Sequence, residues 1–193
     1  MTERLKSELH SIKQLRNLCN PQNESAVNAE IIFLRLLHIV PGVIWVGGTI
    51  FFAFVLQPAL SKTGSSHSGA VMHNMVKPML ALIHSTAWMT IIFGLAMAFR
   101  VRDPLFDFLW SSNWGIAIVL GFVTAITGYG LGVISGRYSK KVMDVSAVTS
   151  ESPLPPVQES EVRDLQNRAM TLSKVSALFV VFSVVTMALA QHI

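Results

Sequence analysis

Charged residues are scarce in this chain and unevenly distributed. Only 13% of the 193 residues are Asp, Glu, Lys or Arg, whereas 51% are hydrophobic, and the mean hydropathy is +0.51. None of these four residue types occurs in residues 36–61, 78–99, 108–136 or 175–193, which together make up about half of the chain. A helix needs about 20 apolar residues to cross the hydrocarbon of a bilayer. The pattern therefore excludes a soluble globular enzyme and a nucleic-acid-binding module.

Cysteine is almost absent as well. Because Cys19 is the one cysteine, the chain forms no internal disulfide, which excludes a disulfide-built secreted domain. The formal net charge of +4 would suit nucleic acid in a soluble protein, but here Lys and Arg flank apolar runs and are expected to meet lipid headgroups. We expect the lipid bilayer as the partner and no nucleic acid. Other membrane subunits or a second copy of the chain are alternatives.

The apolar runs predict an all-α membrane protein, a four-helix up-and-down bundle that forms one domain over residues 28–193. Pro41 interrupts the first span without ending it, and Pro58 is expected to end it. Residues 144–160, rich in Pro, Ser, Thr and Glu, are predicted to form a mobile linker. The expected spans are about residues 31–56, 79–99, 113–136 and 171–191.

The charges beside the spans bear on orientation. Four spans put both termini on one side of the membrane, and the opposite side holds slightly more Lys and Arg. The positive-inside rule then favours termini on the outside.

The N-terminal segment, residues 1–27, is predicted to form an amphipathic helix. Its apolar residues recur at helical spacing, namely Leu5, Leu9, Ile12, Leu15 and Leu18. Such a pattern is typical of a helix that lies on a membrane surface. A solvated helix that packs on a partner is the alternative.

His38 is the first candidate functional residue, because an ionisable group within a span is costly unless it has a role. Gly42, one turn further on, has no side chain and would leave room for a flat porphyrin bound to His38. Arg35 lies one turn nearer the membrane surface and would pair with a propionate. The alternative is a structural histidine that hydrogen-bonds the carbonyl freed by Pro41, with Arg35 reaching to headgroups.

His84 is the second candidate, in the next span. The two spans enter from opposite sides, so at 1.5 Å per residue the levels of His38 and His84 should differ by about 10 Å. One iron would then not bind both residues. Either each histidine binds at a site of its own, or His38 binds alone or with another group near its level, such as Met187 or Met97. A hydrogen bond to a neighbour is the alternative for His84, with the candidate partners Ser85, Thr86 and Tyr129.

A soft-ligand cluster near the membrane surface suits Cu(I) by ligand type. Methionine is also a common apolar filler of cores, so packing is the alternative. The candidate copper ligands are His67, Met72, His73, Met75 and Met79.

Small residues on one face of the third span predict close helix packing. A flat cofactor could use the same smooth surface. The face consists of Gly121, Ala125, Gly128, Gly132 and Gly136.

The first span resembles the opening helix of the CopD-like membrane proteins and the related HemJ protoporphyrinogen oxidases. The resemblance lies in residues 37–48, LHIVPGVIWVGG, and in Pro58-Ala59-Leu60. It continues more weakly in Lys77-Pro78, Phe93-Gly94-Leu95, Gly128-Tyr129 and Gly136-Arg137. It implies a four-helix membrane bundle in which His38 matches a histidine associated with b-type haem. Lys77 would correspond to a functional lysine, and CopD-like proteins are linked to copper handling.

The leading hypothesis is a multi-pass protein of a prokaryotic-type plasma membrane that binds haem b through His38. It would act as an oxidoreductase, in electron transfer or in oxidation of a hydrophobic or porphyrin-like substrate. Copper transport and a cofactor-free structural subunit of a membrane complex are the alternatives.

Overall fold

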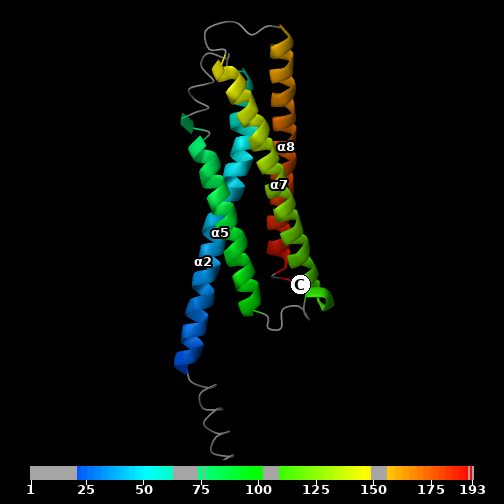
Figure 1. Cartoon of the computed structure of the whole chain (residues 1–193). Coiled ribbons are helices and arrows are strands. Elements are labelled where there is room, and N and C mark those ends of the chain that lie inside the picture. The colour runs from blue at the N-terminus through cyan, green and yellow to red at the C-terminus, as the bar shows by residue number, and fades with distance from the viewer. Residues whose placement is uncertain are drawn as a thin grey trace, which may run out of the picture.

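The computed structural model describes residues 21–62, 74–75, 77–101, 109–148, 156–190 and 192. Four long helices, α2 (Pro21–Phe51), α5 (Lys77–Val101), α7 (Asn113–Val148) and α8 (Pro156–Leu189), run alternately up and down the bundle (Figure 1). No strand occurs among the described residues. The helices long and apolar enough to cross a membrane cover Asn28–Ala59, Lys77–Val101, Asn113–Val142 and Glu159–Leu189. The expected all-α four-helix membrane bundle is confirmed.

Several helices extend beyond the expected spans. The helix α2 begins at Pro21, within the segment expected to be a separate amphipathic helix, and residues 1–20 of that segment lie outside the described part. Residues 144–148 and 156–160, assigned to the linker, belong to α7 and α8. Proline at a first helical turn needs no N–H partner, which suits the start of α8 at Pro156. Exposed ion pairs four residues apart then support its polar first turns, Glu159 with Arg163 and Asp164 with Arg168.

Pro58 does not end the first helix. After α2 the chain forms a π-helical turn, η1 (Phe52–Leu56), and continues as α3 (Gln57–Lys62). Because Pro58 has no N–H, the usual bond to the carbonyl of Phe54 is lost, and the N–H of Gln57 donates to the carbonyl of Phe52, five residues back. The wider turn shifts the helix face, and Phe52, Ala53, Leu56 and Gln57 are all buried.

Helices α7 and α8 form a tight antiparallel pair. Ser183 Oγ donates to the Gly121 carbonyl at 2.7 Å, and Ser176 Oγ to the Gly128 carbonyl at 2.7 Å. One heptad further along, Ser135 Oγ donates to the Ala169 carbonyl at 2.8 Å. A residue seven positions later in α7 therefore contacts a residue seven positions earlier in α8.

The expected packing role of the small-residue face holds for most of its members. A Cβ at Gly121, Gly128 or Gly132 would come within 3.2 Å of α8 side chains, and Ala125 is buried. In the described part of the chain, no atom lies within 4 Å of a Cβ at Gly136. The surface that a flat cofactor could have used is therefore covered by α8.

Helices α2 and α5 form the second pair. Arg100 Nε donates to Glu30 Oε1 at 2.9 Å and Arg100 Nη2 donates to the other carboxylate oxygen, which joins the two helices at one end. Nearer the middle, a Cβ at Gly48 would lie 3.1 Å from Ile83 Cγ1, so this glycine lets the helices approach closely. The two pairs meet around a buried cluster of Trp45, Phe52, Leu56, Ile83, Ala87, Ala125 and Val180.

Candidate functional site

His38 lies between α2 and α5. Its Nδ1 is 2.8 Å from the carbonyl oxygen of Thr90, and since a carbonyl only accepts, Nδ1 carries the proton and Nε2 its lone pair. A Cβ at Gly94 would lie 2.6 Å from both Cε1 and Nδ1 of the ring, so the imidazole fills the space above this glycine. His38 therefore bonds a carbonyl of α5, not the carbonyl freed by Pro41 on its own helix.

The surroundings of His38 differ in one respect from the expected haem site, in which Arg35, His38 and Gly42 share one face of the helix. A Cβ at Gly42 would lie 3.4 Å from Thr90 Cγ2, so Gly42 faces α5 and its clearance is taken by a threonine. Arg35 is exposed, one turn from His38 towards the start of α2. Nε2 of His38 would thus be the atom that holds an iron, with Arg35 one turn away, but a porphyrin would not lie against Gly42.

His84 occupies a different environment, facing α7 across the junction of the helix pairs. Its ring stands edge-on to Tyr129 with centroids 5.5 Å apart, and Tyr129 makes similar edge contacts with Trp45 at 6.3 Å and Trp88 at 5.9 Å. Among the described residues, the alternative of a hydrogen bond to Ser85, Thr86 or Tyr129 is not realised, and Nδ1 has no partner. Ser85 and Thr86 donate to carbonyls of their own helix instead.

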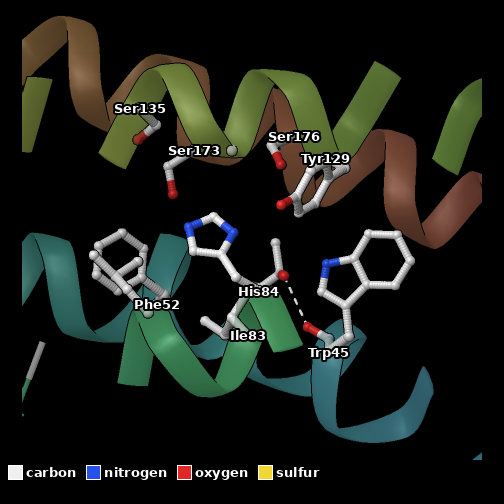
Figure 2. A pocket seen from close by; sticks show the side chains of 11 residues that line it. Trp45, Phe52, Ile83, His84, Tyr129, Ser135, Ser173 and Ser176 are labelled. Carbon is white, nitrogen blue, oxygen red and sulfur yellow. Dashed lines mark hydrogen bonds between the residues drawn. The ribbon is translucent and has the colours of Figure 1, made fainter. Parts of the chain in front are cut away.

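The ring of His84 lines a pocket of about 30 Å³ between the two helix pairs. Figure 2 shows the imidazole and the hydroxyl of Ser173 pointing into this space from opposite sides. The volume suits one or two water molecules and is far below the roughly 300 Å³ or more of a cofactor site. The lining residues are Trp45, Thr49, Phe52, Leu80, Ile83, His84, Tyr129, Gly132, Ser135, Ser173 and Ser176.

Two buried side-chain atoms lack a hydrogen-bond partner among the described residues, His84 Nδ1 and Gln57 Oε1. The amide nitrogen of Gln57 reaches Ser139 Oγ at 3.5 Å. Leaving a buried polar atom unpaired costs about 1–3 kcal/mol, and no bulk water relieves this inside a bilayer. These two atoms lie at the two ends of a set of polar residues that we call the polar strip: His84, Ser173, Ser135, Ser139 and Gln57. The sequence analysis did not identify Gln57 or these serines. The available signal was Gln57, the one side-chain amide within the uncharged residues 36–61.

The two histidines lie at different levels. His38 contacts α5 at Thr90 and Gly94, whereas His84 is six residues before Thr90, or about 9 Å along the helix axis. This separation agrees with the expectation that they do not bind one iron. Of the proposed second ligands, Met187 packs on Gly121 of α7. Met97 is half-buried on α5, three residues beyond Gly94.

The expected copper cluster is only partly described. His67, Met72 and His73 lie outside the described residues. Met75 is exposed, and Met79 packs against the buried cluster at the junction of the helix pairs. Within the described part of the chain, no group of three or more His, Cys, Asp or Glu side chains gathers in a way that could hold a metal ion.

Comparison with known proteins gave no match to a family model, to a curated protein or to a solved structure.

Proposed function

We propose that this membrane protein binds haem b through Nε2 of His38 and acts in electron transfer or in oxidation of a hydrophobic or porphyrin-like substrate. The observation that carries the proposal is the hydrogen bond from His38 Nδ1 to the Thr90 carbonyl. Histidines that ligate metals almost always donate their other ring N–H to such a group, which fixes the tautomer and makes the ligating nitrogen more basic. The resemblance of the first span to HemJ-like proteins supports the same residue.

The surrounding residues have separate tasks in this proposal. Gly94 leaves room for the imidazole and the Thr90 carbonyl orients it, so Nε2 is held in one direction. Arg35 would offer a charge-assisted hydrogen bond to a propionate at the edge of the membrane. Met97 would be the better placed of the two methionines to hold the haem together with His38, because it belongs to the helix that His38 contacts. When bound, haem supplies reversible one-electron chemistry at iron.

A visible spectrum of the protein purified in detergent, with haem and copper quantified, tests this function. We expect a Soret band, lost in His38→Ala and kept in His84→Ala, because His84 lies at another level of the bundle. His84→Ala is the matched control, since it also removes an imidazole from the interior. A Soret band that survives in His38→Ala would contradict ligation of haem by His38. Stoichiometric copper without haem would support the CopD-like alternative.

A further inference from the structure

The polar strip at the junction of the helix pairs is not used by the proposed haem site. One end of the strip is the pocket beside His84, and the other end is the buried amide of Gln57. Gln57 follows Phe52 by five residues, and Ser139 follows Ser135 by four, so their contact lies about 6 Å beyond the pocket. Both helices continue from there to lysines that are exposed, Lys62 and Lys140. The strip therefore runs from His84 towards the end of the bundle where α3 ends.

The aromatic rings of Trp45 and Tyr129 line the opposite end of the pocket. Tyr129 lies edge-on to Trp45, Trp88 and His84 at once, and Trp45 is 4% exposed. His38 precedes Trp45 by seven residues, about 10 Å along α2 on the other side of these rings. The strip thus extends from the pocket towards the end of the bundle where α3 ends, and the aromatic rings lie on its other side.

The chemistry of the lining suits water. The hydroxyls of Ser135 and Ser176 donate to backbone carbonyls, so their oxygens remain as acceptors. Gln57 Oε1 needs a donor and His84 Nδ1 needs a partner of either kind. Among the lining residues Tyr129 is the one other titratable group, and none is charged. A molecule that both donates and accepts, and that fits about 30 Å³, is water.

We propose that internal water occupies this strip, bonded to His84 in the pocket and to Gln57 beyond it, and makes His84 a proton-exchanging site inside the membrane. In each transfer the water beside His84 gives one O–H proton to the ring nitrogen and takes one proton from the next water towards Gln57, so water is restored and the imidazole becomes imidazolium. The reverse step breaks that ring N–H bond and returns the proton along the same waters. Protons enter from the end near Lys62 and stop at the aromatic rings. The inference does not rest on haem, since the residues that hold the His38 ring, Thr90 and Gly94, are not among those that line the pocket.

Magnetic resonance of the full chain in lipid bilayers, with ring-labelled histidine, tests for the water. We expect magnetisation to pass from water to the His84 ring, identified by its loss in His84→Asn. Ser173→Val places methyl groups in the pocket and should remove most of this transfer. Ser85→Val is the matched control, because Ser85 lies beside His84 on the exposed face of α5. A His84 ring without water contact in the unaltered protein overturns the proposal, as does equal transfer in Ser173→Val.

The route to the surface has its own test in Gln57→Leu, which keeps the size of the side chain. We expect proton exchange at the His84 ring to slow by about tenfold, as when a barrier rises by one lost hydrogen bond. Ser61→Ala is the control, because its hydroxyl bonds its own helix on the exposed side. An unchanged exchange rate in Gln57→Leu contradicts entry past this residue.

Discussion

At the scale of single residues, the two histidines within the spans differ in what holds them. His38 is fixed by a carbonyl and a glycine of the neighbouring helix, whereas His84 is held by aromatic edges and keeps an unpaired nitrogen. Fixing one ring nitrogen leaves the other ready for a metal. An unpaired nitrogen beside a small polar pocket favours water instead. The same residue type is thus suited to two different tasks within one bundle.

Gly94→Ala tests the packing of the His38 ring against Gly94. The new Cβ would lie 2.6 Å from two ring atoms, so the ring or α5 must shift and the bond to Thr90 is strained. We expect a loss of about 1–3 kcal/mol in the free energy of unfolding, as for overpacked cores. Gly47→Ala is the control, because no atom of the described residues lies within 4 Å of the added Cβ. Unfolding by SDS in mixed micelles compares the two, and equal stabilities would contradict the contact.

The sequence predicted which histidines lie within spans, but not what they touch. The uncharged runs and helical rise were enough to place His38 and His84 at different levels. The partner carbonyl of His38 belongs to Thr90, 52 residues away. The rotation of one helix about another sets such a contact, and spacing within a single span does not encode it.

At the scale of elements, the π-helical turn η1 and the seam, meaning the contact between α7 and α8, determine which side chains are buried. The turn at Phe52–Leu56 brings Gln57 inward, and the seam of serines and glycines holds α7 against α8. The sequence predicted the glycine face of α7. It does not predict the turn, because a proline at position 58 is expected to end the helix. The lost hydrogen bond is accommodated by one wider turn, as membrane helices allow.

Gly128→Ala tests the seam. The added Cβ would lie 2.8 Å from Val180 Cγ2 and 3.2 Å from the Ser176 carbonyl oxygen, which is backbone and cannot rotate away. We expect a destabilisation of about 1–3 kcal/mol. Gly130→Ala meets nothing within 4 Å and should leave stability unchanged or raise it by up to about 1 kcal/mol. Equal stabilities of the two variants in an unfolding titration would disprove the close approach.

At the scale of the whole molecule, two antiparallel helix pairs meet around an apolar cluster with a small polar pocket beside it. The number of spans and their alternating direction were predictable, because they depend only on lengths of apolar sequence. The pairing of α2 with α5 and of α7 with α8 depends on how small residues and hydroxyls fit together across helices. That fit became visible only in the structure.

The up-and-down order predicts that both termini lie on one side of the membrane. Cys19 reports the N-terminal side, and His192→Cys in a Cys19→Ser background reports the C-terminal side. We expect a membrane-impermeant thiol reagent to label both on intact cells, since the charge distribution favours termini outside. Lys62→Cys in the same background should be protected. Labelling of Lys62→Cys together with either terminal cysteine would contradict the arrangement.

The most direct test of the haem proposal is the visible spectrum of His38→Gly with and without added imidazole. Removing the side chain would leave the iron without this ligand and open the space beside Gly94, and free imidazole would replace the lost ring in both respects. We predict that the Soret band is lost in His38→Gly and returns as imidazole is added. A Soret band of full intensity in His38→Gly before imidazole is added would contradict ligation by His38.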